Sequence, residues 1–528
     1  MSAAAPTPSS LLDDLAAIVG DAHVLDDADS VTLYAQDVHT KGLPALAVVQ
    51  PANTEELSRS VAAAAAAGHA VIARGGGMSY TSGYVPREEG SIMIDMRRMN
   101  QVLEVNREDM YVTVQSGCTW ADLHEALSGT GLRTPCWGTL SGIRATVGGG
   151  ASQNGIFWGS ARYGTIVDSI LSLEVVLADG QVVRTGAGAQ AEANPFFRHY
   201  GPDLTGLFTC DTGALGFKAT VTLRLVPESP ARRGLSFDFE TSADAVRAMS
   251  AIGRADIASE CFAFDPYLQQ VRMQRDSLAN DVKKLAGVVK SSGSVLGAIR
   301  DSAKLAIAGR GYMKDVRYSV HVLVEERIDA AADHNIAEVR RLCTEHGGQE
   351  LQDSIPKVLR ANPFTPLNNV VGPQGERWVP IHTIVPHSKA GAVLAGVEDI
   401  FEQQRERIDE HGIGVGFLLA LVATNGFVIE PVFFTPDEMN ELHREVVEDG
   451  VLKSLPGFAA NEAARALTND LRQQVIELFR RAGGVHMQIG KSYPYRDGLR
   501  PESWRLVSAV KQAVDPQGRV NPGSLGLE

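Results

Sequence analysis

Three consecutive glycines, Gly75–Gly77, are the residues best suited to hold a charged ligand, in the run Arg74-Gly-Gly-Gly-Met78-Ser79. Glycine has no Cβ atom and tolerates positive φ, so consecutive backbone N–H groups in such a loop can converge on a phosphate oxygen. Arg74 could add a positive charge and Ser79 a hydroxyl donor. Taken alone, the triplet is equally typical of a tight turn that binds nothing.

A second glycine cluster follows about seventy residues later, in the run ATVGGGASQNG at residues 145–155. Neither cluster has the G-x-x-x-x-G-K-S/T spacing of a nucleoside triphosphatase loop, and neither shows G-x-G-x-x-G at the start of a helix, which disfavours a Rossmann dinucleotide site. Two separate glycine loops therefore suggest a long ligand that carries more than one phosphate.

Four segments in this order carry a family resemblance: RGGGMSYTSG, ATVGGGASQNGIFWGSARYGTIVDSILSLEVVLADG, GPDLTGLFTCDTGALGFKATVTLRLVP and AVDPQGRVNPG. Their order and spacing, across nearly the whole chain, resemble the vanillyl-alcohol oxidase/p-cresol methylhydroxylase (PCMH) superfamily of flavoproteins. In that family the two glycine loops hold the FAD pyrophosphate, and the third segment reaches the ribose and adenine. The resemblance implies FAD contacts at Arg74, Gly75, Gly76, Gly77, Met78, Ser79, Val147, Gly148, Gly149, Asn154, Gly155, Tyr163, Asp168, Gly216, Phe217 and Asn521.

The usual residues for a covalent flavin bond are replaced in this sequence. Met78 stands where the family's first glycine loop carries a histidine, and Arg144 stands where bicovalent members have a cysteine. Neither a thioether nor a guanidinium is used for that bond, so we expect dissociable FAD. A tether through a His or Tyr of the second half is an open alternative without a motif.

The resemblance directs attention to proton-handling side chains in the second half, because the protein must remove a hydroxyl or phenol proton while the flavin takes hydride. The run GVHMQIGKSYPYR at residues 484–496 distantly resembles the H-W-G-K segment of aldonolactone and alditol oxidases. Strand alternation would place His486 and Gln488 on one side, with Lys491 if the strand runs that far. A lone strand histidine is, alternatively, typical of a satisfied structural residue.

The run RWVPIHTIVPHS, residues 377–388, resembles the cap strand that opens with W-x-x-P in the phenol-oxidising branch. It would place Trp378 and His382 on one face, whereas His387 beyond Pro386 reads as a solvated loop residue. Glu430 lies on an apolar strand, where an acid needs a partner, and a structural salt bridge is the favoured interpretation. The catalytic candidates are His486, Lys491, Trp378, His382 and Tyr493.

Two family chemistries lack their motifs here. The Tyr-Arg pair that stabilises a phenolate corresponds to Gln488-Ile489, and the H-x-G-D-G-N-x-H metal motif does not occur, so no metal is expected. The resemblance thus implies an FAD-dependent oxidoreductase that oxidises a hydroxyl-bearing carbon, in an alcohol or 2-hydroxy acid, by hydride transfer to flavin N5. The alternatives are a 4-substituted phenol or benzylic alcohol oxidase or dehydrogenase, and a non-catalytic flavin-binding or electron-transfer partner.

The elements that must position these residues predict an α+β fold. In the first half, strands near residues 43–50, 70–73 and 170–177 accompany an alanine-rich helix that Gly68 ends. Alternation from Phe217 to Leu225 predicts a strand, and prolines then mark a boundary. Beyond it, strands are predicted at 234–240, 316–325, 378–385, 413–423 and 426–434, and helices at 242–252, 328–346 and 388–411. This alternation predicts an antiparallel sheet backed by helices. We expect a PCMH-type FAD-binding domain of two subdomains at 1–228, a substrate-binding cap at 229–489, and a C-terminal segment at 490–528 that returns to the first domain.

Composition limits the partners. The chain has 528 residues, 49 Lys and Arg against 63 Asp and Glu, and a net charge of −14, which disfavours nucleic acid. Five scattered cysteines and no signal-peptide pattern suggest the cytoplasm. Residues 266–315 carry nine Lys and Arg against four Asp in an amphipathic pattern. This insertion could touch a membrane surface or a partner, or pack as a cap insertion or homodimer contact. The expected small-molecule partners are a substrate and O₂ or another electron acceptor.

Overall fold

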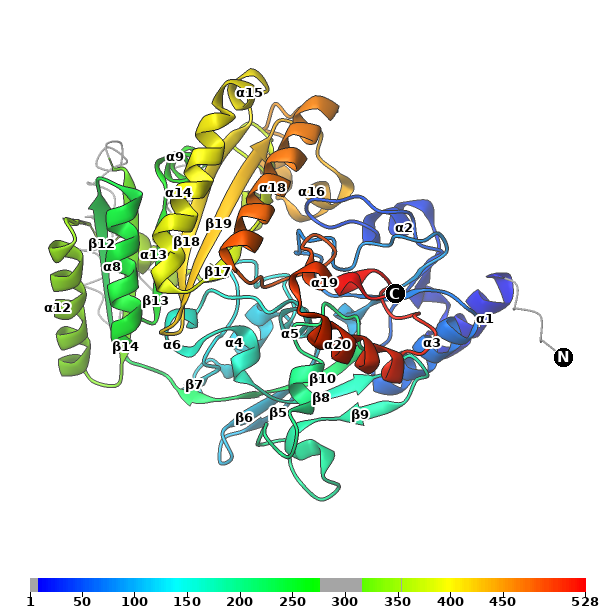
Figure 1. Ribbon diagram of the computed structural model, residues 1–528. Helices are drawn as coiled ribbons and strands as arrows, with labels where there is room; N and C mark the ends of the chain where they lie inside the picture. The colour runs from blue at the N-terminus through cyan, green and yellow to red at the C-terminus, as the bar shows by residue number, and fades with distance from the viewer. Residues whose placement is uncertain (1–7, 276–315, 353) are drawn as a thin grey trace.

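The computed structural model describes residues 8–275, 316–352 and 354–528. These residues combine three main β-sheets with helices, which confirms the predicted α+β class (Figure 1). Most of the basic insertion predicted at 266–315 falls outside the described residues. Within them, no helix is long and apolar enough to cross a membrane.

The first sheet carries the first glycine loop. It is formed by β1 (Val24–Leu25), β2 (Ala47–Val49), β4 (Ile92–Asp95) and β3 (Val71–Arg74), in that order, with β2, β4 and β3 parallel. All three residues of β2 are fully buried, as expected of the apolar strands in a parallel sheet. Helix α3 (Thr54–Ala66) begins at its N-cap Asn53, whose side chain accepts a hydrogen bond from Glu56 N.

The second sheet is antiparallel. It includes the strand that follows the third family segment, the one expected to reach the ribose and adenine. Its order is β5 (Val102–Asn106), β6 (Tyr111–Gln115), β10 (Phe217–Arg224), β8 (Ile170–Val176) and β9 (Val182–Arg184). A separate pair, β7 (Leu132–Arg133) and β11 (Val226–Pro227), ends just before the predicted boundary at 228.

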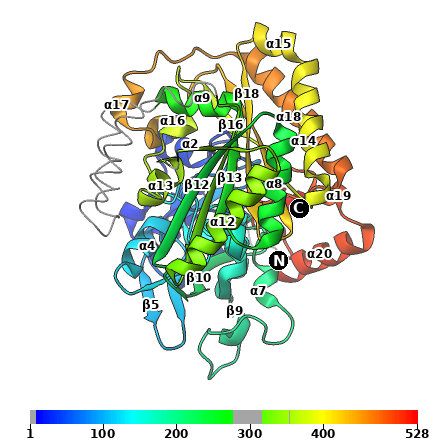
Figure 2. The ribbon, with the colours of Figure 1, turned by 90° about the vertical axis from the view of Figure 1, so that its left-hand side faces the viewer.

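The described residues of the second half form one antiparallel sheet of eight strands. These are β15 (Gln349–Leu351), β12 (Ala231–Phe239), β14 (Tyr318–Glu326), β13 (Glu260–Phe264), β18 (Gly414–Val422), β19 (Gly426–Thr435) and β16 (Arg377–Pro380), with β17 (Thr383–Val385) also paired to β19. Figure 2 shows β12 and β13 behind α12 and α8. We call this sheet the cap sheet.

Four long helices cover one face of the cap sheet: α8 (Ser242–Ala255), α12 (Asp329–Glu345), α14 (His387–Gln403) and α18 (Glu462–Ala482) (Figure 1). Successive side chains along each strand point to opposite faces of the sheet. On β18, Phe417 and Leu419 pack under the helices, whereas Leu418 and Ala420 line the opposite face. This second face, buried against the first half of the chain, is the one that can meet a ligand.

The remaining helices are short connectors or lie at the edges. They are α1 (Pro8–Val19), α2 (Ala28–Tyr34), α4 (Trp120–Leu127), α5 (Val147–Gln153), α6 (Ser160–Tyr163), α7 (Leu204–Leu207), α9 (Pro266–Arg275), α13 (Ser354–Ala361), α15 (Arg405–Glu410), α16 (Glu441–Val446), α17 (Asp449–Leu452), α19 (Tyr495–Gly498) and α20 (Pro501–Val514). After α20 the chain returns to the first sheet, where Val71 N donates to Arg519 O at 2.8 Å and Asn521 N donates to Val71 O at 3.0 Å.

Two long elements predicted from the sequence are interrupted. The strand expected near 378–385 splits into β16 and β17, because Pro431 on β19 has no N–H to donate and the backbone N–H of His382 turns to the Tyr493 hydroxyl. The helix expected from 388 to 411 splits at Gln404 into α14 and α15.

Candidate functional site

A pocket of about 300 Å³ lies between the two glycine segments and the face of the cap sheet that the four long helices leave uncovered. Its floor comes from the loop after β3, from α5 and from the segment around Gly213. Its other walls come from α9, β16, β18, β19 and the irregular segment at Met487 and Gln488. The pocket therefore joins the phosphate-cradling residues of the first half to the cap.

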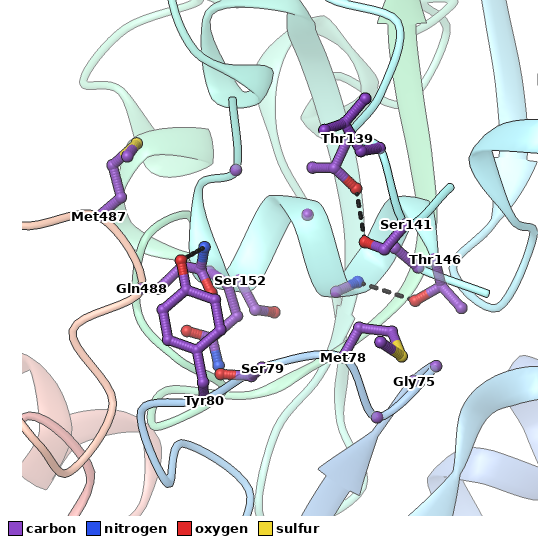
Figure 3. Close-up of a pocket in the computed structure, with 18 of the residues that line it drawn as sticks. Gly75, Met78, Ser79, Tyr80, Thr139, Ser141, Thr146, Ser152, Met487 and Gln488 are labelled. Atoms are coloured by element: carbon purple, nitrogen blue, oxygen red, sulfur yellow. Dashed lines mark hydrogen bonds between the residues drawn. The ribbon is translucent and has the colours of Figure 1, made fainter. Parts of the chain in front are cut away.

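The two glycine segments are in direct contact at the floor of the pocket. A Cβ atom placed on Gly75 would lie 2.4 Å from Thr146 Oγ1, and one on Gly76 would lie 1.8 Å from the carbonyl oxygen of Arg144. Thr146 is the N-cap of α5, and its Oγ1 accepts a hydrogen bond from Gly149 N at 3.1 Å (Figure 3). The second glycine cluster, expected as a loop, thus forms the first turns of a helix.

The structure brings many of the predicted cofactor residues to the pocket lining. They are Gly75, Gly76, Gly77, Met78, Ser79, Gly148, Gly149, Gly155 and Gly216. Figure 3 shows Met78 and Ser79 beside the short helix that begins at the second glycine cluster. Segments separated by up to about 140 residues in the sequence therefore share one wall.

The other predicted cofactor residues do not line the pocket but lie behind it. Val147 and Phe217 are core residues with at most 1% of their surface exposed. Asn154 ends α5 in a left-handed conformation, and Asp168 Oδ2 accepts hydrogen bonds from Thr165 N and Oγ1 at 2.7 and 2.8 Å. These four residues shape the elements that carry the lining.

Arg74, Tyr163 and Asn521 also lie outside the lining. The Arg74 guanidinium packs beneath the first glycine loop and over the rings of Tyr34 and Tyr84. Tyr163 lies under Arg133. Asn521 Nδ2 donates to the carbonyl oxygens of Gly83 and Thr212, both at 2.8 Å, and so connects the C-terminal segment to both sides of the floor.

The lining presents polar atoms that have no hydrogen-bond partner among the described residues. They are Tyr84 Oη, Ser116 Oγ, Trp120 Nε1 and Gln153 Oε1, all of them buried. Leaving a buried donor or acceptor unpaired costs about 1–3 kcal/mol, so such atoms commonly mark a polar ligand. Together with the glycine floor, they fit a long polar cofactor.

An acid and a phenol meet at the cap end of the pocket. Glu430 shares one side of β19 with Val428 and Val432, the side that faces the pocket. Its Oε2 lies 3.5 Å from the Tyr80 hydroxyl. Gln488 Nε2 donates to the same hydroxyl oxygen at 3.3 Å (Figure 3). Burial and the nearby Glu430 charge raise the pKa of Tyr80 well above its usual value, so Tyr80 stays neutral and can donate to Glu430. Trp378 packs edge-on against Tyr80.

His382, His486 and Tyr493, three of the residues predicted as catalytic, form a buried cluster of their own. The His486 and Tyr493 rings stack with centroids 3.9 Å apart. The backbone N–H of His382 donates to the Tyr493 hydroxyl at 2.8 Å, and the ring nitrogen Nε2 of His382 pairs with the carbonyl oxygen of Met487 at 2.7 Å. Burial lowers the pKa of His382 to about 3 and also lowers that of His486, so both rings are neutral. All three lie in the described part of the chain, yet none lines the pocket.

The cluster holds the irregular segment whose residues Met487 and Gln488 do reach the pocket. The strand expected there is absent from the described residues: Val485 makes a single bridge to Ile384, and Gln488 and Gly490 have positive φ. Lys491 also points away from the pocket, with Nζ donating to the carbonyl oxygen of Val85 at 2.7 Å. Burial lowers the pKa of Lys491 to about 7. Of the predicted catalytic set, Trp378 is the residue that lines the pocket.

Comparison with known proteins identifies the family. A family profile described as FAD binding domain matches residues 45–186. The chain is 31% identical to the glycolate oxidase subunit GlcD of Bacillus subtilis over 91% of this chain and 88% of that protein. The chain belongs to the PCMH-type FAD-linked oxidase superfamily. Its cofactor is accordingly FAD, and the glycine floor and unpaired polar atoms of the pocket fit that group.

Two further similarities agree with this family. A D-lactate dehydrogenase of Archaeoglobus fulgidus is 31% identical over 39% of this chain and 44% of its own length. The structure of p-cresol methylhydroxylase with substrate bound superposes with a TM-score of 0.75, covers 98% of this chain and 97% of that chain, and is 18% identical. The superposition confirms the shared fold. These PCMH-type proteins are oxidoreductases, and the chain is an FAD-linked oxidoreductase by family.

Sequence reasoning missed several pocket residues. Tyr80 follows the first glycine loop directly, and Gln153 lies within the second glycine run, so both positions carried a signal. Glu430 was interpreted as a salt-bridged acid on an apolar strand. The two-residue period of that strand places Glu430 on the sheet face opposite to the one that the helices cover. Leu268 and Val271 of α9 had no such signal, because their role depends on how α9 packs.

Proposed function

We propose that the chain is an FAD-dependent oxidoreductase that oxidises a hydroxyl-bearing carbon, with the Tyr80–Glu430 pair accepting the hydroxyl proton. Bound FAD would supply the two-electron acceptor for the hydride. The position of Glu430 beside Tyr80, in the same pocket as the glycine floor, is the observation that carries the proposal.

The proton can leave by a short path. A substrate hydroxyl beside Tyr80 donates its proton to the phenol oxygen while Tyr80 passes its own proton to Glu430, and the hydrogen on the carbon leaves with its electron pair as hydride. The products are a carbonyl compound and a protonated Glu430. Gln488 holds the phenol by donating to its oxygen at 3.3 Å. The apolar side chains of Leu418, Val432 and Phe434 in the pocket lining exclude water.

A 2-hydroxy acid is the second candidate substrate. The names of the similar proteins, a glycolate oxidase subunit and a D-lactate dehydrogenase, favour it. Among the described residues, no group of three or more His, Cys, Asp or Glu side chains could hold a metal ion. Oxidation of a 4-substituted phenol stays a prediction from the sequence.

We also propose that the FAD is held without a covalent bond. Met78 lines the pocket, whereas Arg144 donates to the carbonyl oxygen of Gly76 at 2.9 Å. Among the described cap residues that line the pocket, none is a His, Cys or Tyr, the types that tether flavin in this family. Electrons would pass from the reduced cofactor to O₂ or another acceptor.

The proposal is tested by replacing Glu430 with Gln, which keeps the shape and removes the proton acceptor. The rate of anaerobic flavin reduction by a substrate alcohol should fall roughly 10²- to 10⁴-fold, the usual contribution of a general base. Glu350→Gln is the matched control, because Glu350 pairs with Arg340 on the surface. An unchanged rate in Glu430→Gln, with FAD content equal to that of the wild type, would show that the proton leaves by another route.

A further inference from the structure

Tyr80, which takes the substrate proton in the proposed function, lies in a segment that one short turn holds from both sides. Residues 37–40, which follow α2, form this turn, and we call it the brace turn. Val38 N donates to the carbonyl oxygen of the residue before Tyr80 at 3.0 Å. Ser82 N donates to the Asp37 side chain at 2.6 Å. These two hydrogen bonds fix the backbone on both sides of Tyr80.

Asp37 is the centre of the brace turn. Its side chain is fully buried, and its Oδ1 accepts the N–H groups of His39 at 2.8 Å and Thr40 at 2.6 Å. Burial raises the pKa of Asp37 to about 6, so at neutral pH the group is mainly a carboxylate. Hydrogen bonds to a charged acceptor are about twice as strong as neutral ones. One acid therefore orders the turn and also holds the segment that carries Tyr80.

The cap holds the brace turn through two buried arginines. Arg377 of β16 donates to the carbonyl oxygen of Val38 at 3.4 Å and also to that of His39. Arg472 Nη1 of α18 lies 2.6 Å from His39 Nε2. Burial and the two arginine charges keep the pKa of His39 well below its usual value, so its ring is neutral and can accept this hydrogen bond. The turn is thus fixed from the cap as well as by Asp37.

A third cap contact joins the two ends of the turn. Glu441 of α16 accepts a hydrogen bond from Gln36 Nε2 at 2.8 Å and another from Lys41 Nζ at 2.7 Å. The Lys41–Glu441 pair is exposed, and exposed ion pairs contribute little to stability. The buried contacts of Asp37 and Arg377 therefore determine how firmly the turn is held.

We propose that Asp37 is a positioning residue: through the brace turn it holds the Tyr80 hydroxyl where it can accept the substrate proton, and Arg377 locks the turn to the cap. Asp37 and Arg377 both lie outside the pocket lining, so each acts through Tyr80. The inference rests on the proposed function for the proton transfer. The position of Tyr80 itself can be measured without any reaction.

Asp37→Asn tests the role in catalysis, because it keeps the shape but turns an amide NH₂ toward a backbone N–H. At saturating FAD, the rate of anaerobic flavin reduction should be measured with the fastest of benzyl alcohol, mandelate, 1-hexanol and 2-hydroxyhexanoate. It should fall roughly 10- to 10²-fold, since a misplacement of about 1 Å costs about 10²-fold. In a Tyr80→Phe background the same substitution should change the rate less than about twofold, because the group through which it acts is gone. Asp27→Asn is the matched control: Asp27 accepts a backbone N–H at the start of α2 but lies on the surface.

Fluorine NMR of protein labelled with 3-fluorotyrosine reports the surroundings of Tyr80 without turnover. The Tyr80 resonance is the one that Tyr80→Phe removes. Asp37→Asn and Arg377→Lys should each shift it by more than its line width. Thr40→Val is a milder variant, which removes one hydroxyl contact of the brace turn and should shift the resonance in the same direction as Asp37→Asn. The control Asp27→Asn should leave it in place.

A Tyr80 resonance that stays in place in both Asp37→Asn and Thr40→Val would overturn the inference, and Thr40→Val alone decides if Asp37→Asn does not fold. An equal loss of rate with and without the Tyr80 hydroxyl would also overturn it. A resonance that Arg377→Lys leaves unchanged would refute the lock by the cap. The proposed function fails in a different way. If the resonance shifts as expected while Glu430→Gln reduces flavin as fast as the wild type, the positioning of Tyr80 stands and proton transfer to Glu430 is refuted.

Discussion

The buried cluster behind Gln488 offers a prediction with a definite magnitude. Tyr493→Phe removes one hydroxyl and leaves the ring that stacks on His486 in place. That hydroxyl accepts the backbone N–H of His382 at 2.8 Å and lies 3.4 Å from His382 Nδ1. In the variant the N–H loses its acceptor inside a fully buried site. The 3.4 Å contact with His382 Nδ1 is long for a hydrogen bond, so its loss adds little to the change in the free energy of unfolding.

An orphaned buried donor costs about 1–3 kcal/mol, so the free energy of unfolding of Tyr493→Phe should fall by about that amount. The assay is urea unfolding at one fixed concentration of excess FAD, because ligand binding adds to the apparent stability. Tyr495→Phe is the matched control: Tyr495 is half-buried, and its hydroxyl has no hydrogen bond to the described residues. The control should change by less than about 0.5 kcal/mol, as most substitutions without such a feature do. A Tyr493→Phe value equal to that of the control would refute the positioning role of this cluster.

Three further predictions concern the cofactor and pH. Gly76→Ala places a Cβ atom 1.8 Å from the Arg144 carbonyl oxygen, so FAD affinity, measured by flavin fluorescence, should fall at least tenfold, whereas Gly498→Ala, which meets nothing within 4 Å, should leave it unchanged. Burial lowers the pKa of His382 from the ordinary 6.5 to about 3, so between these pH values the unfolded residue binds a proton that the folded one does not. Stability should therefore fall as pH drops through this window, by up to ~1.4 kcal/mol per pH unit from this residue, and a wild-type slope equal to that of His382→Gln would contradict the assignment. With Met78 in the glycine loop, FAD should stay in the supernatant after acid precipitation, and yellow pellets would disprove non-covalent binding.

Much of the fold could be predicted because its elements carry local signals. The helix from Thr54 follows a capping residue, and the alternation from Phe217 onward identified β10. Strands β18 and β19 of the cap sheet were also predicted, at 413–423 and 426–434, because each is a long apolar run. Strand β13 was missed because it has five residues, all of them buried, and so shows no alternation. The breaks at His382 and Gln404 depend on tertiary contacts that no local pattern shows.

The floor of the pocket could be predicted better than its cap end. Glycine triplets mark close backbone approach directly in the sequence, so Gly75–Gly77, Gly148 and Gly149 were found. The cap histidines were predicted to be catalytic because imidazole can transfer protons near neutral pH. Burial instead keeps both rings neutral, and packing places them outside the pocket lining. His382 and His486 lie behind the pocket, whereas Glu430 lies in it.

The central claim is that this pocket holds FAD and that the Tyr80–Glu430 pair accepts the proton when a hydroxyl-bearing carbon is oxidised. Anaerobic mixing of the FAD-loaded protein with benzyl alcohol, mandelate, 1-hexanol and 2-hydroxyhexanoate tests it most directly, by following the bleaching of flavin absorbance. At least one of these compounds should reduce the wild-type flavin, and Glu430→Gln should slow that reduction roughly 10²- to 10⁴-fold. Flavin that all four compounds leave oxidised, or that they reduce equally fast in Glu430→Gln, would contradict the claim.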